Sequence, residues 1–247
     1  GGWNVRSTHI WQSGQYGYPN LFKNYFEETL SCMADHGGGA PCGAIFYNEP
    51  GLREEDRGQL LFCDWGRATV FRYDLKRKGA TYEMQQNDWQ KGPAPCRPID
   101  IQPDAIGNVY MADWGRNGWG KGSPTGAVVK IRAKDFKPGL KVPDLQKQKT
   151  KDLIEQLACP SQTLRLLTQK ELLARGEEAL PGLLKIMEGG DEVPRIQRVF
   201  ALWTYKQIAK EKGLQSFSFA SPELLKELLG VTPGSVTPFG LMFDTAK

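Results

Sequence analysis

The tetrapeptide Asp-Trp-Gly-Arg occurs twice in this chain, at residues 64–67 and again at residues 113–116. The similarity extends beyond the tetrapeptide, since Gly58 aligns with Gly107, and the alignment resumes downstream after a nine-residue insertion. Each copy contains short stretches of β-branched and aromatic residues separated by Gly, Asp and Pro, which is typical of strands joined by turns. A repeat of about 40 to 50 residues built of short strands is typical of a β-propeller blade.

The repeat predicts four strands in the first unit and three in the second. The segments 43–48 and 97–102 take equivalent places ahead of the two tetrapeptides. A propeller often completes its last blade with a strand from the other end of the chain, but no such strand is recognisable here. Two blades cannot close a ring that needs at least four. We therefore expect residues 1–143 to form the last two blades of a propeller, with strands near 44–48, 59–64, 69–74, 80–84, 98–102, 108–113 and 127–132.

After Asp144 the composition changes from Gly-rich to Leu-rich, which predicts a domain boundary and a helical domain over residues 144–213. Ser161 is the expected N-cap of a first helix, and Gly176 is its expected stop. A second helix is expected over residues 177–188. Helices paired in this way stack as HEAT-like α-solenoid repeats, which serve more often as scaffolds than as catalysts. We therefore expect them to bind a protein partner.

The third expected helix lies between Asp191, as its cap, and Gly213, with Pro194 in its first turn. Apolar residues at helical spacing predict which faces are buried. They are Leu164, Leu167 and Leu172 in the first helix, and Ile196, Phe200, Trp203 and Ile208 in the third.

The composition argues against some classes of function. Among 247 residues the net charge is only +4, and the basic clusters are as short as KRK at 76–78, so no nucleic-acid partner is expected. No apolar run reaches the roughly 18 to 20 residues that a membrane helix needs, so no membrane span is expected. The chain opens without Met and without a signal peptide, and its first residues read as the interior of a longer protein.

The chain has five cysteines and two histidines. No C-x-x-C-H sequence occurs, so no covalently attached haem is expected, and two histidines are too few for a His-rich metal site. Cys42 and Cys96 come just before the first strand of each unit, where a disulfide could join them, although strand geometry can equally forbid it. The sequence leaves both alternatives open.

The repeated tetrapeptide has two interpretations. In the first it is architectural, because Asp bonds nearby backbone amides, Trp fills the space between blades and Gly permits a sharp turn. In the second, the loops at one end of the ring line a central pocket and contribute charge to it. The candidate cofactor-binding residues of the second interpretation are Asp64, Arg67, Asp113 and Arg116.

Several segments together carry a resemblance to a known family. They are, in order, GGGAPCGAIFYNEPGL, RGQLLFCDWGRATVFRYDLKRKGATY, RPIDIQPDAIGNVYMADWGR and the helical LACPSQTLRLLTQKELLARGEEALPGLLKIM. Over residues 1–212 the chain resembles the membrane-bound dehydrogenase-like proteins abundant in Planctomycetes. In that family a propeller similar to that of the glucose/sorbosone dehydrogenases precedes HEAT-type helices.

The resemblance implies a six-bladed propeller in the periplasm or cell envelope that holds pyrroloquinoline quinone (PQQ) and calcium and oxidises a sugar or an alcohol. The histidine that acts as base in the relatives lies in an earlier blade. That blade is absent, so no catalytic residue is assigned and this chain alone is not expected to catalyse the reaction. Arg97 matches a position where the relatives carry arginine near the cofactor, and His36 could face the same pocket. No residue is assigned as a metal ligand.

The last residues resemble a different family. The string GVTPGSVTPFGL follows a short helix expected at 222–229, with Ser221 as its cap. Residues 215–247 are similar to a segment of the YbaK/ProX-type aminoacyl-tRNA deacylases, which hydrolyse mischarged alanyl- or prolyl-tRNA. Where that family carries Asn-Asp, this chain has Phe243 before Asp244.

Three functions stay open. The first is a fragment of a quinoprotein-type dehydrogenase, not catalytic on its own, whose helices dock a partner. The second is a non-catalytic interaction protein made of blades and helices. The third is a fusion related to aminoacyl-tRNA deacylases, in which only the helix-turn-strand segment 214–247 carries the function. The resemblance over residues 1–212 makes the first the leading hypothesis.

Overall fold

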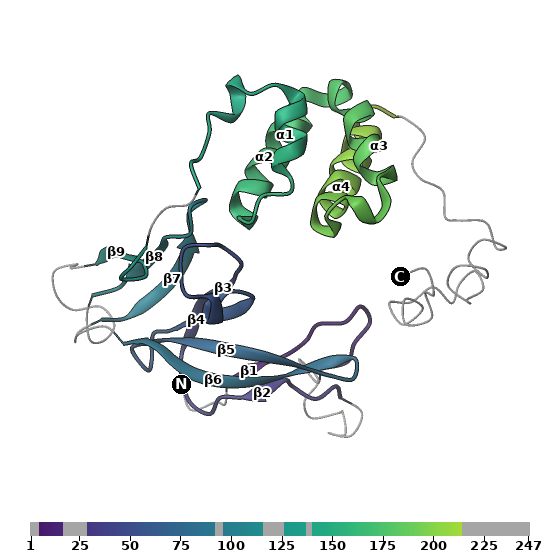
Figure 1. Cartoon of the computed structure of the whole chain (residues 1–247). Coiled ribbons are helices and arrows are strands. Elements are labelled where there is room, and N and C mark those ends of the chain that lie inside the picture. Colours follow the sequence, from purple (N-terminus) through teal and green to yellow (C-terminus); the bar gives the residue numbers. More distant parts are fainter. Residues whose placement is uncertain (1–4, 17–28, 92–95, 116–125, 137–139, 214–247) are drawn as a thin grey trace. The chain divides into compact units, whose positions relative to one another are not determined.

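The computed structural model describes residues 5–16, 29–91, 96–115, 126–136 and 140–213 (Figure 1). The chain separates into two compact units, Gly1–Glu171 and Leu172–Lys247. The first unit contains three antiparallel sheets, and the second is helical in its described part.

The largest sheet has four antiparallel strands in the order β3-β4-β5-β6. They are β3 (Pro41–Tyr47), β4 (Gln59–Asp64), β5 (Thr69–Lys78) and β6 (Thr81–Lys91). All four expected strands are present, but β5 and β6 run well past the predicted ends. The two strands pair from Thr69 opposite Lys91 to Lys78 opposite Thr81, with one bulge. Their length is therefore set by backbone pairing within the hairpin, which the polar sequence of β6 does not reveal.

The second sheet repeats the first three strands of this meander. It contains β7 (Pro98–Pro103), β8 (Val109–Asp113) and β9 (Ala127–Ile131) in chain order, each within one residue of its predicted ends. A third, two-stranded sheet pairs β1 (Arg6–Ser7) with β2 (Ala34–Asp35). Strands of two residues carry no periodicity, so the sequence does not predict them.

The chain is therefore mainly β, with three antiparallel sheets and a few helices, as expected in outline. Within the described residues the structure shows neither a closed propeller nor a HEAT-like helical domain. No helix in this part of the chain is long and apolar enough to cross a membrane. The expected division into residues 1–143, 144–213 and 214–247 stays a prediction, and its last segment lies outside the described residues.

The two larger sheets share one hydrophobic core. In β4 the buried apolar side chains are Leu61 and Cys63, whereas in β8 they are Val109 and Met111. Counted back from the Asp of each tetrapeptide, these pairs differ by one position. Successive side chains in a strand point to opposite faces, so an offset of one residue exchanges the faces. The two copies of the repeat thus bury opposite faces of their sheets against each other.

The loops that follow β3 and β7 touch through two glycines. A Cβ atom on either Gly51 or Gly107 would overlap the backbone of the other, and Gly107 also has a positive φ of 94°. The buried hydroxyl of Tyr47 joins the two loops. It donates to the carbonyl oxygen of Gly107 at 2.8 Å and accepts the N–H of Gly51 at 3.2 Å. Only glycine fits at both positions while the sheets stay this close.

Short helices follow the sheets in the first unit. The 3-10 turn η3 (Leu145–Lys147) precedes α1 (Thr150–Gln156), and α2 (Gln162–Arg175) comes next. One further 3-10 turn, η2 (Glu54–Asp56), lies earlier in the chain, between β3 and β4. Ser161 caps α2 as predicted, because its hydroxyl accepts the N–H of Leu164 at 3.0 Å. The helix stops before Gly176, whose positive φ of 63° is typical of a C-cap glycine.

The start of α2 is also held by the loop after β3. The carboxylate of Glu49, 2% exposed, accepts the N–H of Thr163 at 2.7 Å and its hydroxyl at 2.8 Å. An acidic group is favourable at a helix N-terminus, where the backbone N–H groups have no partner within the helix. Of the three leucines expected to be buried in α2, Leu164 and Leu172 are buried and Leu167 is 42% exposed.

In the second unit, the cap of one helix differs from the prediction. η4 (Gly176–Ala179) precedes α3 (Leu180–Glu188), and η5 (Gly190–Glu192) precedes α4 (Arg195–Glu211). Asp191 does not cap α4, because Pro194 occupies the cap position and no side chain bonds the first N–H groups. Asp191 forms an ion pair with Arg198 at 3.5 Å instead.

Of the predicted buried face of α4, Ile208 is 1% exposed and Phe200 is half-buried, whereas the prediction is wrong at the other two residues. Trp203 is 54% exposed and Ile196 is 40% exposed. Small and polar side chains pack instead, and the hydroxyl of Thr204 donates to the carbonyl of Phe200 at 2.7 Å, one turn earlier in the helix. The buried residues of α4 are Gln197, Ala201, Thr204, Ile208 and Ala209.

Replacing Tyr47 with Phe removes the hydroxyl that joins the two glycine loops and leaves a buried carbonyl and a buried N–H without that partner. We expect Tyr47→Phe to lower the free energy of unfolding by about 1–3 kcal/mol, measured by urea denaturation. Tyr82→Phe, at a ring that is 38% exposed, is the matched control and should change it by less than about 0.5 kcal/mol. Equal effects of the two substitutions would contradict the role given to Tyr47.

Candidate functional site

The first copy of the repeated tetrapeptide folds around the carboxylate of Asp64, which is 1% exposed. Its Oδ1 accepts the backbone N–H groups of Ala40 at 3.0 Å and Arg67 at 2.8 Å, and its Oδ2 accepts the Nε–H of Arg67 at 2.7 Å. The N–H of Trp65 donates to the carbonyl of Ala40 at 2.9 Å. The carboxylate therefore fastens the turn after β4 to the start of β3.

The second copy repeats these contacts. The Oδ1 of Asp113 accepts the N–H groups of Arg97 at 2.6 Å and Gly115 at 2.9 Å. The N–H of Trp114 donates to the carbonyl of Arg97 at 2.8 Å. These are the contacts that the architectural interpretation of the tetrapeptide predicts.

The paired contacts correct the alignment of the two copies of the repeat. Ala40 and Arg97 are equivalent, and each precedes a proline that lies opposite the Asp of its tetrapeptide. The expected equivalence of segments 43–48 and 97–102 is therefore wrong by three residues. The sequence misleads here because both strands contain a bulge after the proline, which hides their register.

Arg97 links the two copies. Its Nη1 donates to the carbonyls of Trp65 at 2.8 Å and Gly66 at 2.9 Å, and its guanidinium lies 5.1 Å from the centre of the Trp65 ring. The rings of Trp65 and Trp114 line one small apolar cavity of about 140 Å³. The predicted binding candidate thus bonds to the backbone of the first tetrapeptide.

His36 lies with Asp64 and Arg67. Its Nε2 is 2.8 Å from the hydroxyl of Ser7, its ring centre is 4.7 Å from that of Tyr73, and its carbonyl accepts from Arg67 Nη1 at 3.4 Å. Burial and the neighbouring Arg67 cation lower the pKa of His36 below its usual 6.5. The structure therefore brings these three predicted residues together.

The remaining predicted residues are placed differently. Asp113 and Arg97 form the second group described above, and Arg116 lies outside the described residues. The groups are connected by the bonds of Arg97 to the first tetrapeptide. The cavities described here are lined by other residues, and the role of these side chains in a binding pocket stays a prediction.

These contacts test whether the predicted residues fit PQQ and calcium. Asp64 and Arg67 bind each other, and Arg97 bonds two backbone carbonyls. Among the described residues no group of three or more His, Cys, Asp and Glu side chains is arranged to hold a metal ion. The described side chains therefore do not fit the quinone with its calcium, and this cofactor stays a prediction from resemblance alone.

The cysteines form no disulfide between the two copies of the repeat. Cys42 and Cys96 are not joined by a disulfide. The three-residue correction explains this, because Cys42 follows the first proline of β3 whereas Cys96 precedes the first proline of β7. Cys42 is exposed and Cys96 is buried. Burial raises the pKa of Cys63 to about 12, which keeps that thiol protonated and unreactive at neutral pH.

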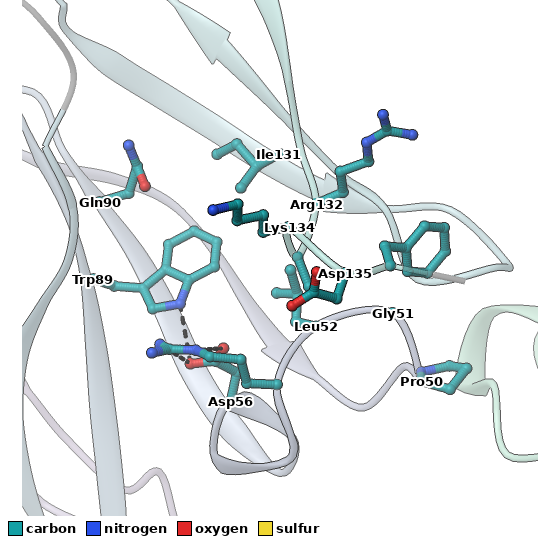
Figure 2. A pocket seen from close by; sticks show the side chains of 13 residues that line it. Pro50, Gly51, Leu52, Asp56, Trp89, Gln90, Ile131, Arg132, Lys134 and Asp135 are labelled. Atoms are coloured by element: carbon teal, nitrogen blue, oxygen red, sulfur yellow. Dashed lines mark hydrogen bonds and ion pairs between the residues drawn. The ribbon is translucent and has the colours of Figure 1, made fainter. Parts of the chain in front are cut away.

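A cavity of about 720 Å³ that the sequence does not predict lies between the loop after β3, strand β6 and the segment after β9 (Figure 2). These stretches are far apart in the sequence and share no motif. The only signal is Trp89, a large aromatic residue in an otherwise polar strand. This cavity is named the Trp89 cavity below. The polar and aromatic residues that line it are Arg53, Asp56, Trp89, Gln90, Arg132, Lys134, Asp135 and Phe136.

The inner wall of the Trp89 cavity is organised by Asp56, which is 1% exposed. Its carboxylate accepts from Arg53 Nε at 3.0 Å and Nη2 at 3.1 Å, from Arg72 Nη1 at 3.0 Å and from the indole N–H of Trp89 at 3.0 Å. The bond to Asp56 raises the pKa of Arg53. Two cations thus compensate one buried carboxylate, and the indole ring is held in place.

One family comparison gives a functional signal. The family model of the aminoacyl-tRNA editing domain matches residues 203–247, of which 203–213 lie within the described residues. No curated protein and no solved structure matches the chain. The expected resemblance of residues 215–247 to aminoacyl-tRNA deacylases is supported, whereas the expected resemblance of residues 1–212 to a propeller dehydrogenase has no support.

The lowered pKa of His36 predicts a pH dependence of stability. A histidine with a folded-state pKa below 6.5 binds protons more weakly in the folded than in the unfolded state, so stability is full above pH 6.5 and is lost as pH falls through the folded value. We expect the urea midpoint to fall between pH 7.5 and about pH 5 by less in His36→Gln than in the wild type. His9→Gln is the control, and its urea midpoint should fall with pH as much as that of the wild type. If the urea midpoint of His36→Gln also falls as much as that of the wild type, the prediction is wrong.

Arg97 gives a second prediction. Arg97→Ala removes the two bonds to the carbonyls of Trp65 and Gly66 and should lower the free energy of unfolding by about 1–3 kcal/mol, measured by urea denaturation. Arg77→Ala, at an exposed position of β5, should cost less than about 0.5 kcal/mol. Wild-type stability of Arg97→Ala would show that Arg97 does not hold the two copies of the repeat together.

Proposed function

We propose that this chain acts on aminoacyl-tRNA through an editing-domain segment that begins in α4. The support is the family match over residues 203–247, which agrees with the resemblance seen in the sequence over 215–247. This proposal takes up the third of the functions that the sequence leaves open. It departs from the expectation that the chain has no nucleic-acid partner, because that expectation rests on the small net charge and the short basic clusters and not on a motif.

The proposed reaction is hydrolysis of the ester bond between tRNA and a wrongly attached amino acid. Water adds to the ester carbonyl carbon, the bond to the ribose oxygen breaks, that oxygen takes up a proton, and free tRNA and free amino acid are released. Asp244 is the candidate acidic residue, since it aligns with the Asp of the family's Asn-Asp pair. It lies outside the described residues.

The described part of the matched segment offers groups that suit an RNA partner. Trp203 is 54% exposed, and the ammonium of Lys206 lies 5.8 Å from the centre of its ring. Lys210, one turn further along α4, is exposed as well. Exposed aromatic rings stack with unpaired bases, and lysines contact phosphates, so this surface of α4 supports the proposal.

The first unit is proposed to be a non-catalytic binding module. Its predicted cofactor residues bond to one another or to the backbone, and the Trp89 cavity combines charged and aromatic side chains. Dehydrogenase activity, a sugar or alcohol substrate and an envelope location stay predictions from resemblance.

Deacylation of mischarged tRNA tests the proposed function. We expect the full chain to release labelled alanine from tRNA mischarged with alanine. Phe243→Asn, which restores the family's Asn-Asp pair, should raise the rate about tenfold, because an amide restores hydrogen bonds worth about 1.4 kcal/mol. Asp244→Ala should abolish the release.

Asp191→Ala, at an exposed acidic residue outside the matched segment, is the control and should keep the wild-type rate. Correctly charged tRNA should lose its amino acid no faster with the protein than without it. If neither the wild type nor Phe243→Asn releases alanine above the rate without protein, the editing proposal is wrong.

A further inference from the structure

The Trp89 cavity has the chemistry of a ligand site and takes no part in the proposed editing step. Its volume of about 720 Å³ falls within the range of small-molecule sites. It belongs entirely to the first unit, where the loop after β3, strand β6 and the segment after β9 supply its walls. It has an aromatic face, cationic groups and one carboxylate in addition to that of Asp56.

The aromatic face is the ring of Trp89. One edge of the ring is fixed, since the indole N–H donates to buried Asp56 at 3.0 Å, and the residue packs against the core of the two sheets. Figure 2 shows the six-membered ring turned toward the side of the cavity from which Ile131 and Lys134 extend. A ring held in this way loses no further freedom when a flat ligand stacks on it.

The inner wall mainly holds the ring in place. Asp56 is bound by the guanidinium groups of both Arg53 and Arg72. Arg53 also lies 2.7 Å from the carboxylate of Glu55, and Arg72 lies 2.8 Å from that of Asp74. The two arginines are therefore engaged by carboxylates and leave no cation for an anionic ligand, so the attraction for such a ligand comes from the outer wall.

The outer wall supplies groups that remain available. Arg132, Lys134 and Asp135 are exposed and line the cavity, and the structure gives none of them an ion pair with another described residue. In Figure 2 the Lys134 side chain and the Asp135 carboxylate extend into the space in front of Trp89, and Arg132 points outward at the rim. One cation and one carboxylate thus lie in front of the aromatic ring, and a second cation lies at the rim.

We propose that the Trp89 cavity binds a nucleotide, either free or as the terminal nucleotide of an RNA strand. The base stacks on Trp89, the phosphate binds Lys134 and Arg132, and the ribose hydroxyls donate to Asp135. An inorganic anion would leave the ring unused, and an uncharged aromatic ligand would leave the two cations unused. A nucleotide uses all three kinds of group, and the inference rests on the first unit alone.

Isothermal titration calorimetry of the full chain with AMP, adenosine and inorganic phosphate tests this site. We expect saturable AMP binding, with affinities for adenosine and for phosphate at least about tenfold lower, because each lacks one set of contacts. Lys134→Gln should weaken AMP binding about tenfold and leave adenosine binding unchanged. Asp135→Asn should weaken AMP and adenosine by the same factor.

Lys141→Gln, at an exposed lysine outside the cavity, is the matched control and should bind AMP like the wild type. Thermal melting of each variant confirms that the exposed substitutions leave the fold intact. Competition with a short single-stranded RNA separates the two sources, because displacement of AMP assigns the site to an RNA end and no displacement assigns it to a free nucleotide.

Three results would overturn the inference. They are a folded wild type without saturable AMP binding, AMP affinity unchanged in both Lys134→Gln and Asp135→Asn, and phosphate that binds as tightly as AMP. None of them bears on the editing proposal, whose readout is alanine release from tRNA.

Discussion

The close packing of the two larger sheets is the constraint on which the first unit depends. They share one core because the two copies of the repeat bury opposite faces, with Leu61 and Cys63 from one and Val109 and Met111 from the other. Close packing without side chains between the loops requires glycine on both sides and a hydroxyl that satisfies the backbone between them. The rest of the unit is positioned by this contact, including the start of α2 and the loop that carries Asp56.

The repeated tetrapeptide uses its polar groups to build structure. Each Asp accepts backbone N–H groups from its own turn and from the residue before the paired strand, so these backbone groups have hydrogen-bond partners. Arg97, in the second copy, donates to two backbone carbonyls of the first copy and so joins the two. Groups engaged in this way have little capacity left for a further ligand.

The two functional proposals belong to different parts of the chain. The editing proposal rests on a sequence segment that begins in α4, and the nucleotide proposal rests on a cavity in the β unit. The first follows from similarity and the second from geometry, so neither supports the other. Both proposals name ligands that contain a nucleotide. The small net charge of the chain does not predict such ligands.

The sequence by itself determined the local elements. Strand-forming stretches, turn residues, the Ser161 cap and the Gly176 stop depend on neighbours within a few residues, and they lie where predicted. The tertiary structure alone decided which face of each sheet is buried, the three-residue correction in register, and the exposure of Trp203 in α4. It also assembled the Trp89 cavity from three distant stretches. These features depend on contacts between residues far apart in the chain, and no local pattern encodes such contacts.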